Sequence, residues 1–181
     1  RYDRLFAAIA ESGVVIAHHL TVTKHLWGTF RRDPTPQKGI FTGLPPSLMM
    51  EPMMWYFLTG ILELHPGLKI VWVEPGLFWI PGFLRFLDRR MHQHYDFPGV
   101  KELPSTYWKR QMAVTFVDEP EAIDNRYELG VENLLWSTDF PHPCCNWPNA
   151  QAKVAEMFKD MPDEETDKIT WGNGARMYGF A

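Results

Sequence analysis

A short apolar run, Leu68-Lys69-Ile70-Val71-Trp72-Val73, is followed at once by Glu74-Pro75-Gly76. The run contains β-branched residues and a single charge, which is typical of a strand buried on both faces of a parallel sheet. Proline and glycine then end the strand. The charged side chain of Glu74 is therefore expected at the carboxyl end of a buried strand.

Outward from this run, strands and helices alternate along the whole chain. Apolar runs predict further strands at 14–17, 112–117 and 133–137, the first of them buried. Apolar residues at helical spacing, together with turn residues, predict helices at 5–10, 50–62, 79–95, 120–129, 150–160 and 163–178, the last with Asp163 as its N-cap. Four strands, each followed by a helix, indicate an α/β fold with a parallel sheet.

Four strand–helix units are half of an eight-fold TIM-type (β/α)8 barrel, which usually needs roughly 250 residues. An open doubly wound sheet is the alternative, but no glycine-rich phosphate turn follows any of the strands. No repeat or linker composition divides the chain, so residues 1–181 are treated as a single unit.

Composition excludes several classes of protein. With 18 basic and 22 acidic residues the formal net charge is −4, which argues against nucleic-acid binding. No apolar run is long enough for a membrane span or a signal peptide. Two adjacent cysteines, Cys144 and Cys145, provide no disulfide framework, so we expect a cytoplasmic protein. Because the chain opens at Arg1 without an initiator methionine, we also expect it to be part of a longer polypeptide.

Ionisable residues follow each predicted strand. They are His18-His19, Glu74, Asp118-Glu119, and Asp139 with His142 beyond it. In parallel α/β folds the carboxyl ends of strands meet at one edge, where function collects. Imidazole and carboxylate are the donors that zinc, manganese and iron take. A metal site is therefore one hypothesis, whereas Asp118-Glu119 are expected to cap the next helix.

A long segment without period, residues 20–46, follows the first strand and is expected to be a loop that selects the substrate. Trp27 could stack on an aromatic substrate there, or it could pack the loop against the rest of the fold.

Three stretches carry a resemblance to a known family. They are Leu134-Leu135-Trp136-Ser137-Thr138-Asp139-Phe140-Pro141-His142, the segment His65–Pro81 running on to Arg85, and Asn173-Gly174-Ala175-Arg176-Met177-Tyr178-Gly179. Together the chain resembles the second half of the amidohydrolase-related metal-dependent TIM-barrel family, which includes aminocarboxymuconate semialdehyde decarboxylase and the resorcylate and dihydroxybenzoate decarboxylases. The resemblance implies strands five to eight of the barrel.

The resemblance also implies roles for residues. It makes His18 a metal ligand, or His19 if the register shifts by one, and it makes Asp139 a second ligand that can handle a proton. Arg85 resembles an arginine that crosses a dimer interface to hold the substrate carboxylate, which implies a homodimer; the alternative is a plain arginine on a helix surface.

Two features depart from the family pattern. Glu74 stands where the best-known decarboxylases have a catalytic histidine, and it is kept as an acid–base candidate together with His142. The first-strand metal motif has no counterpart, because this chain begins just before the fifth strand of the pattern.

From this resemblance we expect a metal-dependent hydrolase or non-oxidative decarboxylase. Its substrate would be a small carboxylic acid, aromatic or muconate-like, and its cofactor one divalent ion, with zinc as first choice and manganese or iron as alternatives. The competing hypothesis is a non-catalytic half-barrel or assembly module that lacks the first-strand ligands.

Overall fold

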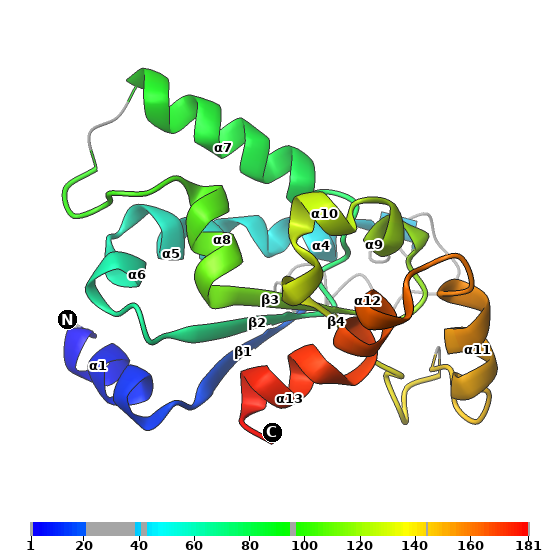
Figure 1. Cartoon of the computed structure of the whole chain (residues 1–181). Coiled ribbons are helices and arrows are strands. Elements are labelled where there is room, and N and C mark those ends of the chain that lie inside the picture. The colour runs from blue at the N-terminus through cyan, green and yellow to red at the C-terminus, as the bar shows by residue number, and fades with distance from the viewer. Residues whose placement is uncertain (1, 21–38, 41–42, 95–96, 144, 181) are drawn as a thin grey trace.

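The computed structural model describes residues 2–20, 39–40, 43–94, 97–143 and 145–180 and contains a four-stranded parallel sheet (Figure 1). The strands are β1 (Val15–His19), β2 (Lys69–Val73), β3 (Met112–Phe116) and β4 (Leu134–Trp136). They lie in the order β1-β2-β3-β4, and every neighbouring pair is parallel. A doubly wound sheet would reverse its strand order at a switch point. The predicted α/β class is confirmed, and the sequential order argues against the doubly wound alternative.

Helices connect the strands. They are α1 (Asp3–Ser12), α4 (Pro45–Leu48), α5 (Met50–Leu58), α6 (Ile61–Leu64), α7 (Ile80–His94), α8 (Pro104–Gln111), α9 (Pro120–Asp124), α10 (Arg126–Leu129), α11 (Ala150–Met157), α12 (Asp163–Asp167) and α13 (Asn173–Tyr178). A 3-10 turn, Val131–Asn133, precedes β4, and a π-helical turn, Lys168–Gly172, joins α12 to α13.

The sheet has two distinct faces, because successive strand residues point to opposite sides. The helix face contains Trp72, Val114 and Phe116, which are fully buried in a large apolar core under helices such as α5, α7 and α8 (Figure 1). The opposite face of the sheet, called the inner face below, carries Val71, Ala113 and Leu135, which pack on Met177 of α13. By this register His18 shares the helix face with Trp72, and His19 shares the inner face with Val73.

The first strand is less buried than its sequence predicts. Ala17 and His19 are exposed, and Val14 just before the strand is 59% exposed. In the part of the chain that the structure describes, β1 is an edge strand with a neighbour on one side only. Its apolar side chains therefore keep solvent contact.

Three predicted helix boundaries are wrong. The helix expected at 50–62 breaks at Gly60, whose φ of +76° is left-handed and whose added Cβ would lie 3.1 Å from the Gly99 carbonyl oxygen. The helix expected at 120–129 breaks at Asn125. Asp163 begins α12 as its first residue, since Pro162 occupies the N-cap position. Helix α8 has no counterpart in the prediction.

Two buried asparagines fasten the amino ends of β3 and β4. Asn133 Nδ2 donates to the carbonyl oxygens of Met112 at 2.7 Å, Lys109 at 3.0 Å and Trp108 at 3.3 Å. Asn173 Nδ2 donates to the carbonyl oxygens of Val131 at 2.7 Å and Leu134 at 2.9 Å. Buried carbonyls need such partners, so these carboxamides stabilise the end of the sheet away from the predicted chemistry.

Candidate active site

Two carboxylates stand at the carboxyl edge of the sheet in a strained backbone conformation. Glu74 follows β2 directly and has a φ of 56°, and Asp139 lies just beyond β4 with a φ of 57°. Among the described residues these are the two non-glycine positions with positive φ. That conformation costs roughly 1–2 kcal/mol for an L-residue. Strain of this kind persists only where surrounding contacts hold it, and it clusters at functional sites.

The turn that carries Glu74 is held by three hydrogen bonds. The Glu74 backbone N–H donates to Thr115 Oγ1 at 3.1 Å, and the Leu77 N–H donates to Glu119 Oε2 at 2.7 Å. Between them, Trp79 Nε1 donates to the Pro75 carbonyl oxygen at 2.8 Å. The turn is therefore fixed at its start, its middle and its end.

The expectation that Asp118-Glu119 cap the next helix is wrong. Glu119 occupies the N-cap position of α9, but its side chain makes no capping hydrogen bond and reaches Leu77 instead. Burial raises the pKa of the Glu119 carboxyl, and the hydrogen bond from Leu77 acts in the opposite direction. Asp118 pairs with Lys153 at 3.4 Å.

The segment that carries Asp139 also folds back on itself. The Asn146 N–H donates to the Thr138 carbonyl oxygen at 3.1 Å, and the His142 N–H donates to the Asp139 carbonyl oxygen at 2.8 Å. This places His142 Nδ1 3.1 Å from Asp139 Oδ2, with the imidazole 60% exposed. The sequence candidates Asp139 and His142 thus contact each other.

The Glu74 and Asp139 carboxyls influence one another. Burial raises the pKa of Glu74, and a hydrogen bond with Asp139 and the negative charge of Asp139 raise it further. His19 and His142 act in the opposite direction. The four side chains form what we call the edge cluster: Glu74 and Asp139, flanked by His19 and His142.

The geometry of His19 fixes its tautomer. Its Nδ1 lies 2.9 Å from the Leu20 carbonyl oxygen, which can only accept, so Nδ1 carries the proton. Nε2 is then the nitrogen that faces Glu74, 3.3 Å from Oε1. A backbone carbonyl on one imidazole nitrogen is the usual way of presenting the other to a metal.

His18 lies on the other side of the same strand. Its ring stacks on Trp72 and its Nε2 lies 2.8 Å from Tyr56 Oη, while burial lowers its pKa. Strand neighbours point to opposite faces. The structure therefore brings His19, rather than His18, to the carboxylates.

Of the two predicted substrate contacts, the structure describes Arg85, which does not touch the edge cluster. Arg85 is on the exposed surface of α7, 65% accessible, and forms an ion pair with Glu128 of α10. Trp27 falls outside the described residues.

Sequence reasoning missed Thr115, which holds Glu74. The available signal was a hydroxyl within the otherwise apolar strand Met112–Phe116, on the same face as Ala113.

The donors of the edge cluster are of the kind that zinc, manganese and iron bind. Among the residues that the structure describes, however, no group of three or more His, Cys, Asp and Glu side chains is arranged to hold a metal ion.

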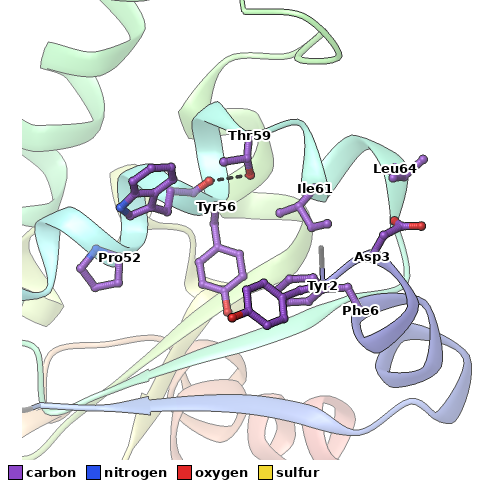
Figure 2. A pocket seen from close by; sticks show the side chains of 9 residues that line it. Tyr2, Asp3, Phe6, Pro52, Tyr56, Thr59, Ile61 and Leu64 are labelled. Atoms are coloured by element: carbon purple, nitrogen blue, oxygen red, sulfur yellow. Dashed lines mark hydrogen bonds between the residues drawn. The ribbon is translucent and has the colours of Figure 1, made fainter.

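An apolar pocket of about 600 Å³ lies apart from this cluster (Figure 2). Phe6 of α1 and Tyr56 of α5 line it with their rings edge to face, the centroids 6.2 Å apart, and Figure 2 shows Ile61 above Tyr2 beside them. The pocket is lined by no carboxylate of the edge cluster, and Tyr56 in its lining contacts His18 on the helix face of β1.

Comparisons with known proteins identify the family of this chain. A family model described as amidohydrolase matches residues 1–180, so the chain belongs to the amidohydrolase family. Among curated proteins none matches the sequence.

Solved structures share the fold. An amidohydrolase from Mycobacterium avium subsp. paratuberculosis K-10 superposes with a TM-score of 0.81 at 20% identity, over 98% of this chain and 45% of that one. The 5-carboxyvanillate decarboxylase of Sphingomonas paucimobilis gives 0.70 at 26% identity, over 98% and 54%. A dihydroxybenzoic acid decarboxylase from Polaromonas sp. JS666, with bound manganese and 2-nitroresorcinol, gives 0.72 at 18% identity, over 99% and 54%.

The chain therefore spans about half the length of the solved structures that it matches. Within the described part of the chain, no helix has the length and apolar character that crossing a membrane requires.

Proposed function

We propose that residues 1–181 form one structural unit, the carboxyl-terminal half of a TIM-type barrel with strands five to eight. The sequential parallel order of the four strands supports this, because each barrel strand pairs with the next one along the chain. The matched share of 45–54% in the three solved structures supports it too.

We infer that the complete protein is a non-oxidative decarboxylase of a small carboxylic acid, aromatic or muconate-like. The observation that carries this proposal is the pair Glu74–Asp139, both in left-handed backbone at the carboxyl edge of the sheet, where burial and the neighbouring Asp139 carboxylate raise the pKa of Glu74. The decarboxylases among the solved structures support the same reaction class.

The chemistry requires one proton. Decarboxylation breaks the bond between the carboxylate carbon and its neighbour, leaves the electron pair on that neighbour, releases carbon dioxide and places a proton on the carbon. Because burial and the neighbouring Asp139 carboxylate raise the pKa of Glu74, this carboxyl is the proposed proton donor. His142, in contact with Asp139, orients that carboxylate and can return the proton from solvent.

One divalent metal ion is the proposed cofactor, zinc first and manganese or iron as alternatives. From this chain, His19 Nε2 and Asp139 would hold it, with His19 replacing His18 because of the face on which each lies. When bound, the ion supplies positive charge that fixes the substrate carboxylate and a neighbouring oxygen. The remaining ligands would come from the first half of the barrel.

Hydrolysis is the second candidate, because the matched family is described as amidohydrolase. Asp139 would then take a proton from the attacking water.

Arg85 is proposed to bind the substrate carboxylate of a neighbouring subunit in a homodimer, after exchanging its partner Glu128 for that carboxylate. A cytoplasmic location stays a prediction.

The test uses the full-length protein. Native mass spectrometry reports subunit mass, oligomeric state and bound metal together. Carbon dioxide release is then measured with dihydroxybenzoates and 5-carboxyvanillate, and hydrolysis with lactones and amides. We expect metal-dependent decarboxylation that is lost in Asp139→Asn. A metal-free protein without turnover on either set would support the non-catalytic module instead.

A further inference from the structure

We propose that Thr115 and Glu119 are positioning residues that clamp the Glu74 turn in its active conformation. This inference rests on the proposed role of Glu74. Both side chains come from β3 and the residues just after it, whereas the turn that they hold follows β2, so the clamp crosses from one strand to the next.

The Thr115 contact of the clamp lies at the strained backbone of Glu74. Glu74 has a left-handed φ, and its N–H, which faces β3 across the sheet, donates to Thr115 Oγ1 rather than to a backbone carbonyl. Thr115 lies on the inner face of β3, partly buried, in the same row as Ala113. A side-chain acceptor here gives the turn a hydrogen bond while its backbone leaves the regular strand conformation.

The second half acts at the end of the turn. Glu119 Oε2 accepts the Leu77 N–H at 2.7 Å, and Leu77 is fully buried. Trp79 Nε1 ties the intervening Pro75 carbonyl. The Glu119 carboxyl therefore accepts a hydrogen bond from a backbone N–H at the end of the turn.

The arrangement limits how far the Glu74 carboxylate can move toward or away from Asp139. Small displacements of a reacting group are costly, because misplacement by about 1 Å can reduce a rate roughly 100-fold. Thr115→Val removes the acceptor and preserves the shape, whereas Thr115→Ser restores it. Glu119→Ala and Glu119→Gln form the corresponding pair, since glutamine keeps an oxygen for Leu77.

The experiment has a readout independent of activity. Amide hydrogen exchange, followed by NMR, should accelerate at least about five-fold at Glu74 in Thr115→Val and at Leu77 in Glu119→Ala. Exchange should return to the wild-type rate in Thr115→Ser and Glu119→Gln. Thr170→Val is the matched control, because the Thr170 hydroxyl donates to the Thr166 carbonyl within its own helical turn. Unchanged exchange at Glu74 in Thr115→Val would overturn the clamp.

Turnover in the full-length protein provides the second arm. We expect kcat to fall roughly 10- to 100-fold in Thr115→Val with KM little changed, and to recover in Thr115→Ser. Faster exchange with unaltered kcat would refute the positioning role. If instead Glu74→Gln retains full activity, the proposed function of Glu74 fails, while the exchange data on the clamp still stand.

Discussion

The imidazole of His18 lies nearly parallel to the indole of Trp72, with ring centroids 4.9 Å apart and an interplanar angle of 21°. The edge of Tyr56 approaches the same imidazole at 5.3 Å, and its hydroxyl contacts Nε2. One histidine of the adjacent pair is therefore part of the aromatic packing on the helix face. Its neighbour His19 is left to contact Glu74.

Alanine substitutions should separate these two histidines. His18→Ala removes a stacked ring and a hydrogen-bond partner of Tyr56, so we expect a loss of roughly 1–3 kcal/mol in the free energy of unfolding. His19→Ala, at an exposed position, should change stability by less than about 0.5 kcal/mol but should weaken metal binding in the full-length protein. Urea unfolding and metal titration measure the two effects. The reverse pattern would restore His18 as the ligand.

Glu74→Gln should exchange activity for stability. Two partly buried carboxyls that face each other repel when both are ionised, and glutamine removes one of these charges while keeping its size. In metal-free protein near neutral pH we expect a gain on the order of 1 kcal/mol together with a loss of turnover. Glu128→Gln, in the exposed pair with Arg85, serves as a control for the loss of one charge. A destabilised Glu74→Gln protein would argue that His19 and His142 already offset the repulsion between the two carboxyls.

Glu119 should make stability depend on pH in a defined direction. Its folded pKa is raised above the ordinary value of 4.5, chiefly by burial. Between 4.5 and the raised pKa, the folded state keeps a proton that the unfolded state has lost, so stability falls as pH rises through this window.

Glu119→Gln should remove that fall while preserving the bond from Leu77. The measurement is the free energy of unfolding of both proteins across the window, with the exposed Glu11→Gln as control. The assignment would be contradicted if the difference in unfolding free energy between wild type and Glu119→Gln stayed constant with pH, or if it grew in favour of the wild type as pH rises.

Two glycines should respond oppositely to the same substitution. Gly60→Ala places a Cβ in left-handed backbone and 3.1 Å from the Gly99 carbonyl, so we expect a loss of about 1–2 kcal/mol. Gly82→Ala lies within α7 with open space around the new Cβ, so we expect a gain of about 0.5–1 kcal/mol. Thermal unfolding measures both changes in stability, and equal shifts in Tm for the two variants would refute the backbone argument.

The strands could be predicted because each is a short apolar run that ends in a turn or charge. Which residues of the first strand lie on which face of the sheet could not be predicted. Alternation requires that one of His18 and His19 face the site, but adjacent histidines leave the choice open. It is settled by the register with β2, which places His18 opposite Trp72.

Helix α8 shows another limit of the sequence. Its apolar residues are few, and the Tyr107 hydroxyl both accepts the N–H of the nearby Lys101 and Glu102 and donates to Glu63, 44 residues earlier. Such contacts form only in the folded chain. The same holds for Thr115 and Glu119, whose partners precede them by about forty residues.

The asparagine bonds at the amino ends of β3 and β4 have a consequence for how this protein could be altered. Buried carboxamides secure one end of the sheet, while the strained carboxylates occupy the other. The groups that secure the sheet and those of the proposed chemistry therefore lie at opposite ends of the strands. Libraries randomised in the segments that follow the strands, with Asn133 and Asn173 retained, should yield many folded variants, from which new substrate preferences can be selected.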